Sequence, residues 1–104
     1  MITQEKIDEI VQKIVEGYQP EKIILFGSYA NGTPNEDSDL DLLIVKDVEG
    51  PRRGRTVPVR MMLLDCSVPM DILVYTPEEL KYATSLPITF ESEIIRTGKL
   101  LYAA

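Results

Sequence analysis

Apolar residues recur at intervals of three and four near the start of the chain, and this spacing predicts an amphipathic helix over residues 3–16. Polar and charged residues fill most of the positions between them, so one face of the helix should be buried and the other solvated. Gly17 follows at the point where the helix is expected to end. The residues expected on the buried face are Ile7, Ile10, Val11, Ile14 and Val15.

Three short apolar runs have the length of buried strands, at residues 21–26, 40–45 and 70–75. The segment 31–38 between the first two runs consists almost entirely of turn-forming residues. A further short strand is expected at the edge of the sheet, at residues 100–102. The chain therefore supplies enough strands for one small sheet.

Helical patterns separate the later strands. Pro58 suits the first turn of a helix over residues 57–66, and Thr76 is a favourable N-cap for a helix after the third strand. A last helix is expected over residues 87–97. Since strands and helices alternate without a repeat or a linker, we expect a single α/β domain over residues 1–104. The residues expected to face the core from the first and last of these helices are Val59, Met62, Leu63, Phe90, Ile94 and Ile95.

The charge balance narrows the classes of function. The chain has 17 acidic and 11 basic residues, a formal net charge of −6, and no histidine. Proteins that bind DNA or RNA usually present a basic face to the phosphates, so we expect no general nucleic-acid binding. Because the chain has no histidine to bind a softer metal, any bound metal should be a hard, oxygen-preferring cation such as Mg²⁺. We interpret the local cluster of arginines as a solvated loop and helix start rather than as phosphate or partner contacts; its members are Arg52, Arg53, Arg55 and Arg60.

The cysteine content, the N-terminal segment and the length of the apolar runs indicate in which cellular compartment the protein lies. Cys66 is the only cysteine, so no internal disulfide is expected and a reducing compartment is suitable. The acidic, amphipathic start lacks the features of a signal peptide. No apolar run approaches the roughly 20 residues that a membrane-spanning helix needs. These features predict a cytoplasmic protein without membrane contacts.

The strongest candidate for chemistry follows the first predicted strand. Gly27 and Ser28 break that strand, and ten residues separate Ser28 from Asp39. Glycine permits close backbone approach, and a free helix start favours an anion such as phosphate. Asp39 and Asp41 lie two apart at the start of a strand, so their carboxylates share one face and repel each other unless a cation lies between them. The two features together predict a metal-bound nucleotide.

Asp71 lies near the start of the third predicted strand and could complete a cluster of three aspartates. Such a carboxylate can bind a metal and accept a proton from an attacking hydroxyl. Each feature taken alone has a simpler explanation, as a turn, a solvated strand end or an exposed edge charge. Their order and spacing together favour the nucleotide and metal site.

These residues resemble the motif of the minimal nucleotidyltransferases (MNT) of the DNA polymerase beta superfamily, of the antitoxin type. Gly27, Ser28, Asp39, Asp41 and Asp71 match its G-S, D-x-D and later acidic positions, and the similarity covers most of the chain. The resemblance implies an α/β (α+β) fold with a small mixed sheet and flanking helices. It also implies ATP as donor, two Mg²⁺ ions, and transfer of a nucleoside monophosphate to a hydroxyl with release of pyrophosphate.

The resemblance further implies a role for each matching residue. Asp39 and Asp41 would bridge the metals, Asp71 would help to activate the acceptor hydroxyl, and Gly27 and Ser28 would hold the β and γ phosphates. Asn31 departs from the motif, because many relatives carry a basic residue there.

A partner is also implied, because such proteins are commonly paired with helical HEPN toxins, and some adenylylate a tyrosine of the toxin. The sequence therefore favours a protein adenylyltransferase that acts as an antitoxin in a hetero-oligomer or homo-oligomer. Two alternatives remain open at this point. The chain could block its partner by binding alone, or it could modify a small molecule, as aminoglycoside-modifying enzymes do.

Overall fold

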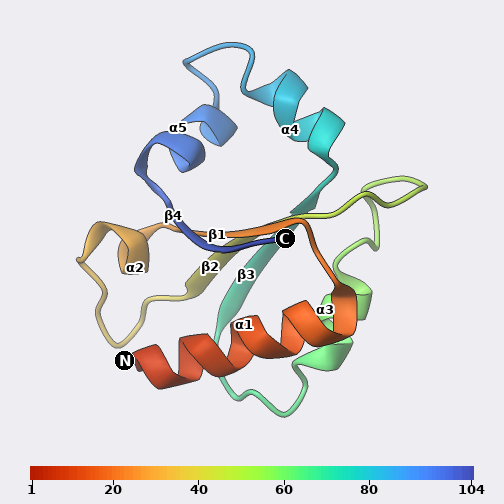
Figure 1. The fold of residues 1–104 in the computed structure, drawn as a ribbon. Coiled ribbons are helices and arrows are strands. Elements are labelled where there is room, and N and C mark those ends of the chain that lie inside the picture. The colour runs from red at the N-terminus through yellow and green to blue at the C-terminus, as the bar shows by residue number, and fades with distance from the viewer.

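The computed structural model describes all 104 residues, which form four strands and five helices (Figure 1). None of the helices is both long and apolar enough to span a membrane. In chain order the elements are α1 (Gln4–Tyr18), β1 (Lys22–Phe26), α2 (Ser28–Asn31), β2 (Leu40–Val45), α3 (Val57–Met62), β3 (Met70–Tyr75), α4 (Pro77–Ala83), α5 (Phe90–Thr97) and β4 (Lys99–Ala103).

The strands form one mixed sheet in the order β3-β2-β1-β4. β1 pairs antiparallel with β2 and with β4, whereas β2 and β3 are parallel. α1 and α3 lie on one face of the sheet, α4 and α5 lie on the other, and α2 lies at the end of the sheet where β1 finishes (Figure 1). The parallel pair needs a crossover, which α3 provides. The mixed sheet with flanking helices that the sequence predicted is confirmed.

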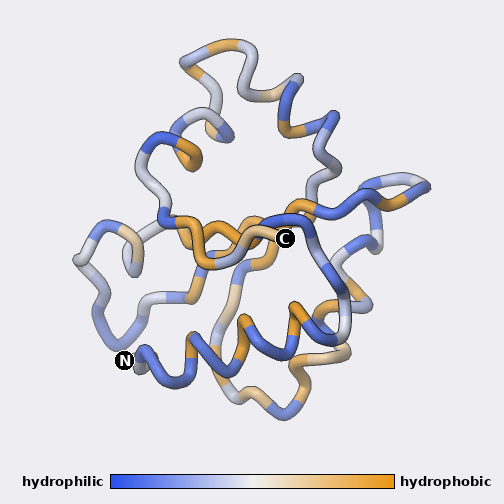
Figure 2. Tube along the Cα trace, viewed as in Figure 1, coloured by the Kyte–Doolittle hydropathy of each residue, from blue (hydrophilic) through white to orange (hydrophobic).

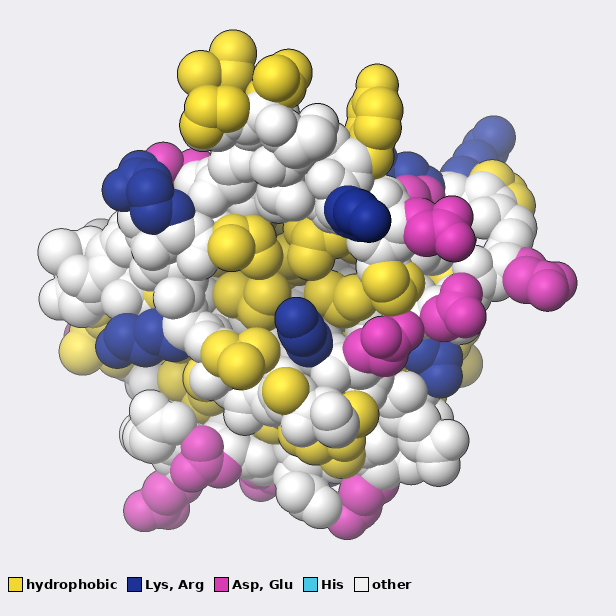
Figure 3. Space-filling model, turned by 45° about the horizontal axis from the view of Figure 1, so that its top comes forward, with side chains coloured by type: hydrophobic (Ala, Val, Ile, Leu, Met, Phe, Trp, Pro, Cys, Tyr) yellow, Lys and Arg dark blue, Asp and Glu magenta, His cyan; other side chains and the backbone are white.

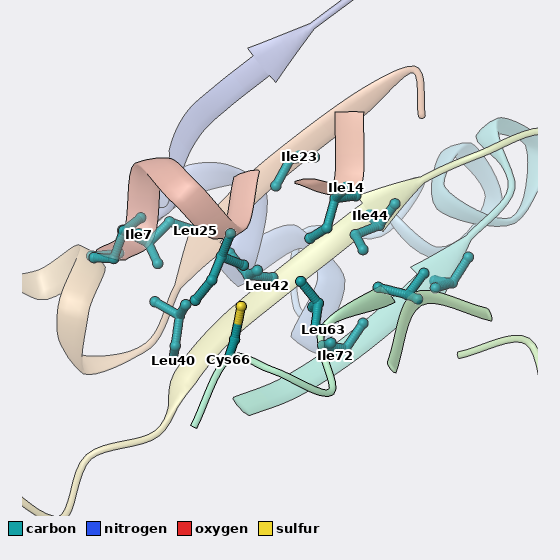
Figure 4. Packing of buried hydrophobic residues seen from close by; sticks show 14 residues of the cluster. Ile7, Ile14, Ile23, Leu25, Leu40, Leu42, Ile44, Leu63, Cys66 and Ile72 are labelled. Atoms are coloured by element: carbon teal, nitrogen blue, oxygen red, sulfur yellow. The ribbon is translucent and has the colours of Figure 1, made fainter. Parts of the chain in front are cut away.

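The larger core cluster lies between the sheet and the α1–α3 layer. Leu40, Leu42 and Ile44 of β2 have no exposed surface, because alternate side chains of the strand all point to this face. Figure 4 shows them close to Ile7 and Ile14 of α1. The apolar positions of α1 and the strands stand out in Figure 2. The amphipathic pattern of the first helix therefore predicted its packing correctly.

The other face of the sheet carries a smaller cluster. It consists of five buried residues, Ile24, Phe26, Leu43, Tyr75 and Ile94. Asp41 lies on this same face, since it alternates with Leu40 and Leu42 along β2. The aspartates of the motif thus face the thinner α4–α5 layer.

Two predicted helices are shorter than expected. The helix predicted over residues 57–66 ends at Met62. The helix predicted over 87–97 begins only at Phe90, because Thr89 is its N-cap and accepts a hydrogen bond from the Ser92 backbone N–H.

The predicted inward face of the last helix is partly wrong. Ile94 is buried, but Phe90 is 57% exposed and Ile95 is 47% exposed. Ile94 lies one turn after Phe90 on the same side of the helix and packs into the smaller core cluster, whereas Phe90, in the first turn, meets Phe26 only edge to face. The remaining apolar side chains lie at the surface.

Arg55 also departs from the sequence interpretation, because it is buried rather than solvated. Its side chain is 5% exposed and donates hydrogen bonds to Glu79 at 2.5 Å, to the Val74 carbonyl at 3.2 Å and to the Gly50 carbonyl at 3.1 Å. One guanidinium therefore joins the loop before α3 to β3 and α4. Its neighbour Arg53 is exposed, as expected.

We predict that Arg55→Met lowers the free energy of unfolding by about 2–3 kcal/mol, because it removes charge-assisted hydrogen bonds. Arg53→Met, in the same loop, should change stability by no more than about 0.5 kcal/mol. Urea unfolding measures both variants, and equal effects would contradict the assigned role of Arg55.

The dependence of the free energy of unfolding on acidic pH also distinguishes Arg55→Met from Arg53→Met. The hydrogen bond from Arg55 holds the pKa of Glu79 below its ordinary value. A carboxylate with a lowered pKa stabilises the fold above its ordinary pKa, and that contribution is lost as the pH falls through the lowered value. The wild type and Arg53→Met should therefore lose this contribution as the pH falls below about 4.3, the ordinary pKa of a glutamate. Arg55→Met should lose less, because only the Thr76 backbone N–H and Arg52 then still lower the pKa of Glu79.

Candidate functional site

Three adjacent strands bring the predicted site residues to one end of the sheet. Phe26 pairs with Asp41 across β1 and β2, and Asp41 pairs with Asp71 across β2 and β3. Residues directly opposite each other on neighbouring strands project from the same face. Gly27 directly follows Phe26, and Asp39 directly precedes β2. The residues that the sequence singled out therefore lie together at one end of the sheet, where β1 finishes and β2 and β3 begin.

Gly27 allows the Asp41 carboxylate to lie against the start of α2. Its φ of +72° is in the region that side chains rarely adopt. A Cβ atom at this position would lie 2.1 Å from Oδ2 of Asp41, which is far inside contact distance. Glycine is therefore required here both by the backbone conformation and by the aspartate beside it.

α2 is a single turn with Ser28 as its first residue. The backbone N–H groups of Ala30 and Asn31 donate to the Gly27 carbonyl, and the buried Ala30 side chain anchors the turn. Tyr29 fixes the outer side, since its hydroxyl accepts a hydrogen bond from the Ile2 backbone N–H at 2.8 Å. The Ser28 hydroxyl takes part in none of the side-chain hydrogen bonds within the protein, which leaves it available to a ligand.

The three aspartates are close enough to influence one another. The pKa of Asp41 is raised, first by its partial burial and then by the negative charges of Asp71 and Asp39. No lysine or arginine forms an ion pair with any of them. The charge of this cluster is therefore not compensated within the chain, which is the electrostatic condition that favours a bound cation.

The protein groups alone do not complete a metal centre. The structure contains no group of three or more histidine, cysteine, aspartate or glutamate side chains that would hold an ion unaided. Asp39 and Asp71 are exposed, whereas Asp41 is half-buried. Carboxylate oxygens suit Mg²⁺, which usually combines one or two carboxylates with water and substrate phosphates. The donor set fits a cation that arrives with its nucleotide.

A small hollow of about 150 Å³ adjoins Gly27 on the side of α5. Phe26 and Asn31 line one side of it, and Phe90 and Glu93 line the other. The rings of Phe26 and Phe90 meet edge to face, with centroids 6.0 Å apart. The sequence analysis missed this contribution of α5, because it assigned Phe90 to the interior. The aromatic residue at the start of that helix was the available signal.

Comparison with known proteins agrees with this geometry. Residues 5–104 match the family described as "Polymerase beta, Nucleotidyltransferase". The chain is 33% identical over 105 residues to a Methanocaldococcus jannaschii protein named as a candidate protein adenylyltransferase. That similarity covers 98% of this chain and 100% of the relative.

Solved structures share the fold at low sequence identity. A candidate nucleotidyltransferase from Sulfolobus solfataricus has a TM-score of 0.67 and 20% identity, covering 95% of this chain and 78% of its own. A chain from the complex of the Shewanella oneidensis MNT antitoxin with a tri-AMPylated HEPN toxin has a TM-score of 0.59 and 15% identity. That match covers 97% of this chain and 72% of the other.

We predict that Gly27→Ala destabilises the protein by about 2 kcal/mol or more, because it adds strain and an overlap with Asp41. Gly32→Ala is the matched control, since Gly32 has a φ of +75° but nothing within 4 Å of the added methyl. It should cost only about 1 kcal/mol. Denaturant unfolding tests both variants, and an equal loss would exclude the predicted overlap with Asp41.

We also predict that Asp41→Asn raises the melting temperature in the absence of divalent cations. The substitution keeps the shape of the side chain and removes a carboxylate that burial and its neighbours disfavour. Because the pKa of Asp41 is raised, the folded wild type should gain stability as the pH falls through that value, and Asp41→Asn should lack this gain. Asp37→Asn, in the exposed loop nearby, is the control. A lower melting temperature for Asp41→Asn alone would contradict the prediction.

Proposed function

Because the chain belongs to the polymerase beta nucleotidyltransferase family, we propose that it transfers AMP from ATP to a hydroxyl group of another protein. The observation that carries the proposal is the strand register that aligns Phe26, Asp41 and Asp71 beside Gly27. A relative that matches along 98% of the chain is named as a candidate protein adenylyltransferase, which supports a protein acceptor.

Asp39, Asp41 and Asp71 would hold two Mg²⁺ ions together with phosphate oxygens of ATP. The uncompensated charge of the cluster supports this assignment. Such a pair of cations stabilises the charge on the entering and leaving oxygens of an in-line displacement at phosphorus. Gly27 and Ser28 would bind the β and γ phosphates through backbone N–H groups and the serine hydroxyl. Asn31 lines the hollow at the other end of α2 and would offer an amide donor where many relatives carry a basic side chain.

The reaction forms one bond and breaks one. The acceptor oxygen attacks the α-phosphorus of ATP, the new O–P bond forms, and the bond from the α-phosphorus to the bridging oxygen breaks. Pyrophosphate leaves with that oxygen. Among the cross-strand neighbours Phe26, Asp41 and Asp71, the side chain of Asp71 is the most exposed. Asp71 accepts the proton of the attacking hydroxyl.

We propose a tyrosine of a HEPN-type toxin as the acceptor, which makes the chain an antitoxin. The structurally similar chain from a complex with an AMPylated HEPN toxin supports this partner. The hollow beside Gly27 has a volume of about 150 Å³, below the roughly 300–1,000 Å³ typical of small-molecule pockets. An acceptor presented by a second protein therefore fits the site better than a small molecule. A reducing cytoplasm suits the single buried cysteine of this chain.

The test combines the chain, a purified HEPN toxin, Mg²⁺ and α-labelled ATP. The wild type should label the toxin, and Asp39→Asn with Asp41→Asn should reduce the initial rate by about 100-fold or more. Asp37→Asn, two residues before the motif, should retain the wild-type rate.

Three outcomes would contradict the proposal. They are a toxin that stays unlabelled with the wild type, equal labelling by the double variant, and labelling that is independent of Mg²⁺. Toxin activity measured in parallel shows whether neutralisation requires the transfer. If the double variant still neutralises the toxin, the antitoxin role rests on binding alone.

A further inference from the structure

An apolar surface covers the outer end of the α4–α5 layer. In Figure 3, hydrophobic side chains project from the α4–α5 connection, and others form the floor of the hollow beside it. The five large side chains of this surface, here called the α4–α5 patch, are Tyr82 at 84% exposure, Leu86 at 58%, Ile88 at 89%, Phe90 at 57% and Ile95 at 47%.

The patch is as large as the apolar surfaces that often mark binding sites. An aromatic side chain buries roughly 150–250 Å² when fully covered, so Tyr82 and Phe90 alone, at 84% and 57% exposure, present roughly 200–350 Å² of it. Leu86, Ile88 and Ile95 add to this area. The largest apolar patch on a typical monomer is about 300–600 Å² and is often functional, and a standard interface buries about 800 Å² on each side. The α4–α5 patch therefore has the size of a large part of one side of a protein interface.

Hydrogen bonds within the connection hold the patch in place. The Ser92 hydroxyl donates to the Leu86 carbonyl at 2.6 Å, and the Thr89 hydroxyl donates to the Ala83 carbonyl at 2.7 Å. The backbone that carries Leu86 and Ile88 is thus fixed at both ends while the apolar side chains point outward. A preorganised surface loses little conformational entropy when a partner binds.

Two hollows enlarge the patch on the side of α5 away from Gly27. One has a volume of about 270 Å³ and includes Val45 and Leu80, and the other has a volume of about 300 Å³ and includes Pro87. Thr84 and Ile95 line both, so the two hollows adjoin. Such a surface can receive side chains of a partner helix.

The patch also reaches the candidate site. Phe90 belongs to it and lines the hollow next to Gly27, where its ring meets that of Phe26. Phe26 is the cross-strand neighbour of Asp41. A protein that covers the patch is therefore held next to the aspartates on the same face of the sheet.

The charges distinguish the kind of partner. Near the patch, Glu79 pairs with Arg55 and Glu93 pairs with Arg96. Glu21, Lys22 and Lys81, which line the hollow of about 270 Å³, form no ion pair but carry charges of both signs. The aspartates of the site have no such partners, and the chain carries a net charge of −6. A second copy of this chain bound at the patch would place its own acidic site near the first, and the two would repel each other. A partner with basic side chains would instead complement the aspartates.

We propose that the α4–α5 patch is the docking surface for the protein that receives AMP. The partner presents an apolar surface opposite the patch and basic side chains opposite the aspartates. This inference rests on the proposed function, because it assigns the acceptor of that reaction to a place on the chain. Docking itself requires neither ATP nor Mg²⁺.

The experiment measures binding of the HEPN toxin by titration calorimetry, without ATP or Mg²⁺. The combined variant Leu86→Glu with Ile88→Glu should bind the toxin about 30-fold or more weakly than the wild type, as expected for central apolar contacts. Leu64→Glu is the matched control, because Leu64 is 74% exposed and lies beyond α3 on the opposite face. It should bind as the wild type does. Melting temperatures of the free proteins should agree, since all three residues are exposed.

The outcomes separate docking from catalysis. Wild-type affinity in the double glutamate variant, or an equal loss in Leu64→Glu, would overturn the docking proposal. The proposal would also be overturned if the wild type formed a dimer through the patch. In that case the double glutamate variant would be a monomer and would still bind the toxin with wild-type affinity. If the wild type binds through the patch but transfers no AMP, the docking proposal stands and the proposed reaction fails.

Discussion

The arrangement of the site depends on the register of three strands. β2 buries Leu40, Leu42 and Ile44 on one face, and Asp41 consequently points to the other. A slip of one residue would exchange the two faces, placing a carboxylate in the core and leucines at the site. The burial of three large aliphatic side chains thus fixes the position of the carboxylate. Stability of the core and alignment of the site have the same physical origin.

The two faces of the sheet serve different purposes. The α1–α3 layer supplies most of the buried apolar contacts, with a cluster of 14 buried residues against five on the other face. The smaller cluster leaves the α4–α5 layer free to present hollows, aromatic rings and charged groups. The stable layer therefore supports a face on which carboxylates can lie close together without a protein cation beside them. This division leaves the aspartates on an accessible face of a stable sheet.

The sequence predicted the elements and the alignment of the motif well, and for a clear reason. Threonine is the N-cap of four helices, and glycine follows α2 and α5. The strands are short apolar runs that resemble no helix of this chain. The expected end of the first helix at Gly17 was wrong, because α1 continues to Tyr18 and Gln19 is its left-handed C-cap. The limits of the prediction concern packing between distant segments. The burial of Arg55 depends on Val74 and Glu79, which lie 19 and 24 residues away, and no local pattern reveals that contact. Phe90 fits the helical period of Ile94 and meets Phe26, yet it lies in the first turn of α5 and stays 57% exposed because few neighbouring segments cover it. The roles of the individual site residues remain predictions.

The buried guanidinium has a further consequence for the edge of the sheet. β3 is an outer strand, and its Tyr75 carbonyl accepts a hydrogen bond from the Lys46 N–H on the side of β2. Backbone groups alternate in direction along a strand, so the Val74 carbonyl points away from the sheet, where Arg55 occupies it. An edge whose acceptor is already bonded, with a positive charge beside it, is a poor template for a strand from another molecule. Arg55 thus occupies one of the backbone acceptors on the β3 edge that a strand from another molecule would need.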